Sequence, residues 1–150
     1  MVSFHVPCYN EPPEMVIQTI TVLTYCTLPA FEIIIMDNNT KDEAVYGPVR
    51  DFVATLGPHV KFYHEENMKG AKAGALNYAL GKTSSHASLV CIVDCDFLVH
   101  PQFAEKHVKY FEQDPKYGEP LIIYTIQPCL PSMLTVYSFE NWSNLSLSLS

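Results

Sequence analysis

Short runs of apolar and β-branched residues alternate along the chain with segments in which apolar residues recur every three or four positions. Five runs are predicted to be strands, several of them apolar throughout, as in a sheet covered on both faces: residues 2–6, 31–36, 60–64, 89–93 and 121–126. The helical spacing is found between them, at residues 16–23, 45–56, 71–80 and 103–111. This alternation predicts right-handed crossovers and an α/β fold, with a mostly parallel, doubly wound sheet in a three-layer, Rossmann-like arrangement.

The chain breakers agree with these elements and suggest one domain. Pro12 and Pro13 precede the first predicted helix, and Gly57-Pro58 ends the second. We predict a single domain over residues 1–130, followed at 131–150 by a truncated or frayed segment. The last eight residues alternate serine and leucine after one asparagine, without a charge, and an edge strand is the alternative there.

Composition narrows the possible partners. The chain has 16 acidic and 9 basic residues and a net charge of -7, so we expect no attraction to nucleic acid or to an anionic membrane surface. Five cysteines without a C-x-x-C pair favour reduced thiols and a cytosolic compartment. No apolar stretch approaches the roughly 20 residues of a membrane span. Any membrane contact is therefore expected through segments outside this chain.

Polar and ionisable residues follow four of the predicted strands. They occupy residues 7–11, 37–40, 65–70 and 94–96. In an open parallel sheet the carboxyl ends of the strands meet at one edge, where ligands bind. The sequence therefore predicts a ligand site built from these four segments.

The sharpest candidate is Asp94-Cys95-Asp96, directly after a buried strand. Two carboxylates at this spacing can bind a hard divalent cation together, or divide between a metal and a sugar hydroxyl. Mg²⁺ or Mn²⁺ bridging a diphosphate is the natural ligand, because such ions complete their shell with phosphate oxygens and water. Surface loops also produce this pattern by chance, so its place at a strand end is what favours the metal site.

Two lysines lie at the start of the third predicted helix. Lys69 and Lys72 stand on either side of Gly70, where free backbone N–H groups and the helix dipole favour an anion. They could offset part of the charge of a diphosphate. The alternative is an ordinary solvated helix start.

Two further carboxylates have two interpretations each. Asp37 could accept a hydrogen bond from a nucleobase N–H or a ribose hydroxyl, or it could stabilise a turn, with Asn39 or Thr40 as the N-cap of the next helix. Glu11 has the same ambiguity. Nucleophilic hydrolase chemistry has no support, because the chain lacks Gly-x-Ser-x-Gly and Cys95 has no convincing histidine partner.

Four segments in order carry a resemblance to a known family: VPCYNEP at 6–12, IMDNNTKD at 35–42, KAGALN at 72–77 and VDCDFLVHP at 93–101. The chain resembles the processive, inverting family 2 glycosyltransferases of the GT-A fold, in the cellulose-synthase-like and β-glucan-synthase-like branch. The likeness covers roughly residues 2–128 and ends in Thr-Ile-Gln-Pro, which is similar to the family's Thr-Pro-Gln region.

The resemblance assigns roles to individual residues. It implies that five residues surround the uridine of a UDP-sugar: Pro7, Tyr9, Asn10, Glu11 and Asp37. It also implies that Lys72 lies near the nucleotide, that Asp94 contacts it, and that Asp96, beside Asp94, holds Mg²⁺ or Mn²⁺ on the diphosphate. One departure is Asn38-Asn39, where many relatives carry a second Asp and a Gly.

The resemblance implies a hexosyltransferase domain that transfers sugar from a UDP-sugar donor, with UDP-glucose favoured, to a growing polysaccharide such as a β-glucan. Relatives place the acceptor site and the general base in a second half, so this chain resembles a truncated, donor-binding half that is inactive alone. It would be a cytoplasmic domain of an integral membrane protein. The alternatives are a non-catalytic nucleotide-sugar-binding fragment or degenerate relative and, ranked lower, a response-regulator-like domain.

Overall fold

The structure is a computed structural model that describes residues 1–112, 121–125 and 134–138. All five predicted strands and all four predicted helices are present. The elements are β1 (Val2–Cys8), α1 (Pro13–Thr24), β2 (Phe31–Asn38), α2 (Glu43–Ala54), β3 (Val60–Glu65), α3 (Ala71–Leu80), β4 (Leu89–Ile92), α4 (Phe103–Glu112), β5 (Leu121–Thr125) and β6 (Leu134–Ser138).

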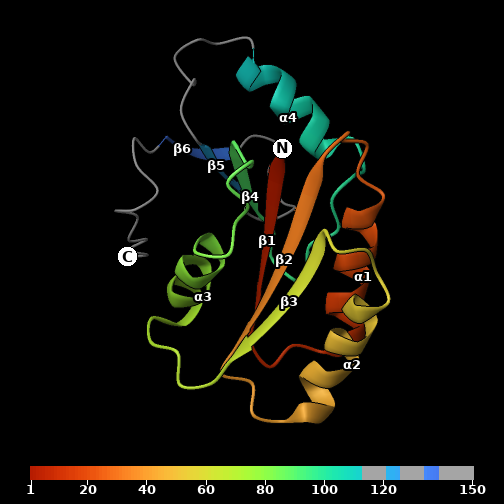
Figure 1. The fold of residues 1–150 in the computed structure, drawn as a ribbon, viewed down its shortest axis with the longest axis vertical. Coiled ribbons are helices and arrows are strands. Elements are labelled where there is room, and N and C mark those ends of the chain that lie inside the picture. The colour runs from red at the N-terminus through yellow and green to blue at the C-terminus, as the bar shows by residue number, and fades with distance from the viewer. Residues whose placement is uncertain (113–120, 126–133, 139–150) are drawn as a thin grey trace.

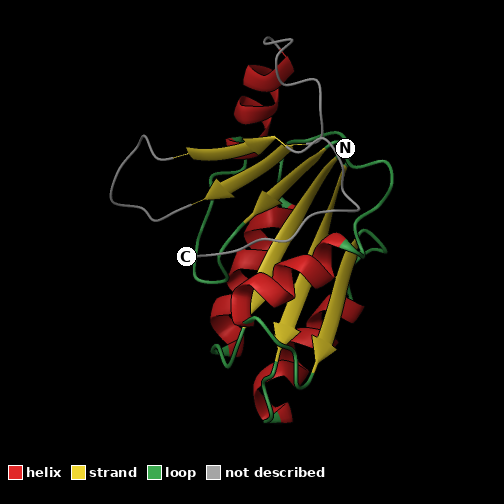
Figure 2. Ribbon diagram, turned by 90° about the vertical axis from the view of Figure 1, so that its left-hand side faces the viewer, coloured by secondary structure: helices red, strands yellow, loops and turns green. Residues whose placement is uncertain are grey.

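The described strands form one sheet in the order β3-β2-β1-β4-β5-β6. The first five are parallel, so the carboxyl ends of β1, β2 and β3 point to the same edge (Figure 2). Strand β6 is antiparallel to β5, with Leu121 opposite Ser138. The predicted α/β fold with a mostly parallel sheet is confirmed.

Strand β6 was not predicted, although Leu-Thr-Val-Tyr-Ser alternates in polarity. Its partner is set by a tertiary contact with β5, which the local pattern does not specify. The strand extends the sheet past the boundary predicted at residue 130, and that boundary stays a prediction. Most of the Thr-Ile-Gln-Pro segment and the serine–leucine repeat lie outside the described residues.

Helices cover both faces of the sheet, with α1 and α2 on one side and α3 on the other (Figure 1). Ile33 belongs to the buried cluster that includes α1 and α2, whereas its neighbour Ile34 packs against Ala79 of α3. Successive side chains of a strand point to opposite faces, so both faces of β2 are buried. This explains why its sequence is apolar throughout instead of alternating.

The start of α2 corrects one expectation. Its N-cap is Asp42, whose Oδ1 accepts a hydrogen bond of 2.9 Å from the N–H of Ala44, and not Asn39 or Thr40. The helix begins two residues later than a cap at Thr40 would place it, and the Thr40 hydroxyl bonds to Asp37 and to the N–H of Asn10. Helix α1 begins with Pro13, whose missing N–H costs nothing in the first turn.

A buried polar group lies within β1. The Nε2 atom of His5 is 2.9 Å from Thr83 Oγ1 and 3.2 Å from Ser3 Oγ. Its Nδ1 is buried with no partner among the described residues. Burial lowers the pKa of His5 to about 4, although the nearby Glu32 carboxylate acts in the opposite direction.

We expect the protein to become less stable as the pH falls from about 6.5 to about 4. In this window the unfolded chain binds a proton at His5 and the folded chain does not, which lowers the free energy of unfolding by about 3 kcal/mol. Urea unfolding followed by circular dichroism between pH 7 and pH 4.5 measures this loss. The difference between the wild-type and His5→Asn curves isolates His5 from the other histidines. Identical pH dependence in the two proteins would contradict the assignment.

Candidate functional site

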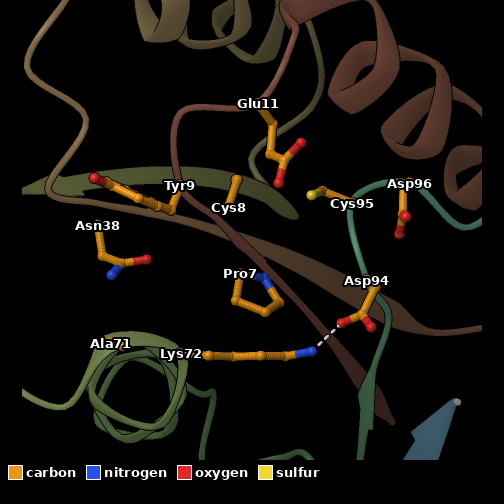
Figure 3. A pocket seen from close by; sticks show the side chains of 10 residues that line it. All are labelled: Pro7, Cys8, Tyr9, Glu11, Asn38, Ala71, Lys72, Asp94, Cys95 and Asp96. Atoms are coloured by element: carbon orange, nitrogen blue, oxygen red, sulfur yellow. Dashed lines mark hydrogen bonds and ion pairs between the residues drawn. The ribbon is translucent and has the colours of Figure 1, made fainter.

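A pocket of about 400 Å³ opens at the carboxyl edge of the sheet (Figure 3). Its walls come from the end of β1 and the following loop, the end of β2, the start of α3 and the loop after β4. The lining residues are Pro7, Cys8, Tyr9, Glu11, Asn38, Ala71, Lys72, Asp94, Cys95 and Asp96. Three of the four segments that the sequence predicted, 7–11, 37–40 and 94–96, therefore contribute to a single site, whereas no residue of 65–70 lines it.

Hydrogen bonds to the backbone of Val93 and Cys95 hold the loop after β4, which carries Asp94 and Asp96, in place. The N–H of Val93 donates to His5 O (2.9 Å), and Thr19 Oγ1 donates to Cys95 O (2.7 Å). Cys95 is only 7% exposed, so its buried side chain holds the centre of the loop. Asp94 and Asp96, one residue to each side, border the pocket.

The two carboxylates differ in their surroundings. Asp94 forms an ion pair with Lys72, which reaches across the pocket from the first turn of α3 (Figure 3). Asp96 is exposed, and no hydrogen bond or ion pair joins its side chain to another described residue. Lys69, the other lysine of the predicted anion site, is exposed and does not line the pocket.

The residues of the pocket fit one kind of metal site. Within residues 1–112, 121–125 and 134–138, no three His, Cys, Asp or Glu side chains come together to hold an ion. Two carboxylates suit Mg²⁺ or Mn²⁺ when other oxygen ligands come from a bound phosphate and from water. The pocket therefore fits a cation that arrives with its substrate better than a closed protein site.

The two thiols of the pocket, Cys8 and Cys95, are not suited to bind a metal as the carboxylates are. Burial raises the pKa of Cys95 to about 12, and it raises the pKa of Cys8 as well. Both thiols stay protonated at neutral pH, and a protonated thiol is neither a good nucleophile nor a good metal ligand. Neither Cys8 nor Cys95 is therefore a candidate nucleophile in this pocket.

The loop after β1 brings Tyr9 and Glu11 to the pocket and leaves Asn10 outside its lining. Tyr9 is 60% exposed, which is unusual for so large an aromatic ring. Asn10 has a left-handed backbone (φ 53°), and its N–H donates to Thr40 Oγ1 (2.8 Å). Asn10 thus ties this loop to the loop after β2.

At the end of β2, Asp37 lies outside the pocket and Asn38 lines it. Asp37 is 4% exposed and does not line the 400 Å³ pocket; its Oδ1 accepts from Thr40 Oγ1 (2.7 Å) and its Oδ2 pairs with His64 Nδ1 (2.7 Å). Asn38, which belongs to the predicted strand-end segment 37–40 but has no role assigned by the resemblance, does line it. Strand alternation puts these two side chains on opposite sides of the sheet, but only the position of α3 shows that the side of Asn38 is the one that faces the pocket.

Comparisons with known proteins agree on one family. The model of the family "Glycosyl transferase family 2" matches residues 3–144. Over 117 residues the chain is 32% identical to the UDP-forming catalytic subunit of cellulose synthase from Xanthomonas axonopodis pv. citri (strain 306). That alignment covers 77% of this chain and 15% of the relative, so the chain spans a small part of the relative's length.

Solved structures show the same fold. The mannosyltransferase PcManGT from Pyrobaculum calidifontis, solved in complex with GDP-Man and Mn²⁺, matches with a TM-score of 0.65 and 28% identity over 76% of this chain and 32% of that one. Residues 1–349 of TarS from S. aureus match with a TM-score of 0.59 and 22% identity, over 75% of this chain and 32% of that one. The second likeness supports the fold alone.

Proposed function

Because the chain belongs to glycosyltransferase family 2, in its cellulose-synthase-like branch, we propose that it forms the donor-binding half of a hexosyltransferase that uses UDP-glucose. The observation that carries the proposal is the meeting of Lys72, Asp94 and Asp96 in one pocket at the carboxyl edge of a parallel sheet. This set offers both a cation and metal-binding carboxylates to the diphosphate of a donor.

The diphosphate is proposed to lie between α3 and the loop after β4. Asp96, free of partners among the described residues, would hold Mg²⁺ or Mn²⁺ with help from Asp94. The metal would neutralise charge on the diphosphate as UDP leaves. The Mn²⁺ and GDP-Man bound by the mannosyltransferase relative support this arrangement.

The nucleoside is proposed to lie at the other end of the pocket. The exposed ring of Tyr9 offers a face for stacking, and Pro7 lines the pocket between Tyr9 and Asp94 (Figure 3). We propose that Glu11, also in the lining, accepts from a ribose hydroxyl. The resemblance assigned Asn10 and Asp37 to the uridine as well, and neither lines the pocket. The Asn10 N–H donates to Thr40 Oγ1, which in turn donates to Asp37 Oδ1, and we propose that these bonds hold the loops around the nucleoside.

Transfer needs groups that we place in the complete protein. An acceptor hydroxyl of a growing polysaccharide, proposed to be a β-glucan, would be deprotonated by a general base outside this chain and attack the anomeric carbon with inversion. We propose that the isolated chain binds donor but transfers little sugar; UDP release from UDP-glucose, measured for the chain and the complete protein, tests this.

We propose further that the chain is a cytoplasmic domain of a protein that the membrane holds through other segments. The four described cysteines are free thiols, in keeping with a reducing compartment. No helix among the described residues is both long enough and apolar enough to cross a bilayer.

Replacing Lys72 tests the phosphate end of the pocket. We expect Lys72→Gln to weaken UDP binding about 10-fold, because a charge-assisted hydrogen bond to phosphate is lost. Isothermal calorimetry with Mn²⁺ present measures the change. Lys69→Gln removes the same charge three residues earlier, outside the lining, and should alter the affinity less than about 2-fold. If both substitutions weakened UDP binding equally, the effect would come from the overall charge of the protein, and this result would contradict a specific phosphate contact by Lys72.

A further inference from the structure

Asn38 lies in the part of the pocket farthest from the metal-binding carboxylates. It is the last residue of β2, is 5% exposed, and lines the pocket together with Tyr9. In Figure 3, Asn38 and Tyr9 stand at one end, and Asp94 and Asp96 stand at the other. A ligand with its diphosphate at the carboxylate end would carry its base to the end where Asn38 lies.

The surrounding bonds hold Asn38 in this position. On one side, Asp37 is fixed by Thr40 and by His64, whose ring stacks on Tyr46 with centroids 4.0 Å apart. On the other side, Asn39 pairs with the backbone of Met68: its Oδ1 accepts from the Met68 N–H (2.7 Å) and its Nδ2 donates to Met68 O (3.0 Å). The neighbours of Asn38 are therefore anchored outside the pocket while its own amide borders it.

We propose that Asn38 contacts the nucleobase and makes the site accept uracil and cytosine alike, an inference that rests on the proposed function. A carboxamide carries both a donor and an acceptor, and a half-turn of the group exchanges them. At positions 3 and 4, uracil presents an N–H donor and a carbonyl acceptor, whereas cytosine presents a nitrogen acceptor and an amino donor. Asn38 can match both patterns, but a carboxylate in its place could only accept.

The test compares UDP with CDP on the full chain. Calorimetry with Mn²⁺ should give affinities for the two nucleotides within about 3-fold for the wild type. Asn38→Asp should shift the ratio about 10-fold toward UDP, because a carboxylate accepts from N3–H of uracil and repels the N3 lone pair of cytosine. Asn67→Asp makes the same chemical change at an exposed residue outside the lining and should leave the ratio unchanged.

A second variant guards against a folding defect, since the new carboxylate would be buried next to Asp37. Asn38→Ala removes donor and acceptor together, so it should weaken UDP and CDP by similar factors and keep their ratio. A wild type that prefers UDP by 10-fold or more, or an Asn38→Ala variant that binds both nucleotides as well as the wild type, would overturn the role of Asn38 while UDP binding stands. Failure of the wild type to bind either nucleotide would overturn the proposed function itself.

Discussion

Gly74→Ala is expected to destabilise the protein by about 3 kcal/mol and to abolish nucleotide binding. A Cβ atom at this position would lie 2.0 Å from Lys69 O and 3.1 Å from Lys69 C. Both are backbone atoms of the turn into α3, where Gly70 already has φ +88°, so no side chain can rotate to relieve the contact. The turn would have to move, and Lys72 would leave the pocket with it.

Gly47→Ala is the matched control for this substitution. Gly47 is also a helical glycine, within α2, but a Cβ there would meet only flexible side chains, with Glu43 Cγ at 3.3 Å and Arg50 Nη2 at 3.7 Å. Alanine is a better helix former than glycine, but Pro48 follows and its ring disfavours helical backbone at a preceding residue that carries a Cβ. We therefore expect a change of less than about 1 kcal/mol in either direction. Urea unfolding of both variants measures the contrast. Equal stability of the two variants would show that the turn accommodates a Cβ at Gly74 without loss of stability.

The elements were predictable because their sequence signals are local. Runs such as residues 31–36 contain little but β-branched and apolar residues, and Pro12-Pro13 and Gly81 mark helix ends. The parallel topology then followed from the alternation of strands and helices. It placed the polar strand ends at one edge before any side chain was located.

The assignment at the end of β2 needed the tertiary structure. Strand β2 is buried on both faces, so its pattern does not reveal which of two neighbouring residues faces the pocket. That depends on α3 lying on the side of Ile34, the side shared by Asn38, while Asp37 shares the side of Ile33. Long-range bonds such as the pairing of Asp37 with His64 join residues whose spacing in the sequence carries no signal.

The ion pair of Asp94 with Lys72, and the exposure of Asp96, could not be predicted from the sequence. The two residues form a symmetric motif, and only the packing of α3 brings Lys72 to Asp94 and leaves Asp96 exposed. The sequence suggested two lysines for a phosphate, but the helix turns Lys72 toward the pocket and leaves Lys69 outside it. The sequence alone does not distinguish a lysine that lines the pocket from one on the surface, because that depends on the position of α3.

Asp96→Ala is expected to lower the affinity for UDP in the presence of Mn²⁺ about 100-fold. The loss follows because no three His, Cys, Asp or Glu side chains of the described residues come together to hold an ion, so removing Asp96 halves the pair of carboxylates. Stability should change little, since the Asp96 side chain bonds to no other described residue. Glu14→Ala, an exposed carboxylate outside the lining, should bind UDP as the wild type does.

The most direct test of the proposed donor site is the heat of UDP binding to the wild type and to Asp96→Ala, each with Mn²⁺ and with EDTA. We predict saturable binding to the wild type with Mn²⁺, lost when EDTA removes the metal, and a variant whose weak residual binding EDTA changes little. Wild-type binding that is equal with Mn²⁺ and EDTA, or no UDP binding at all, would contradict a metal-dependent nucleotide-sugar site at this pocket.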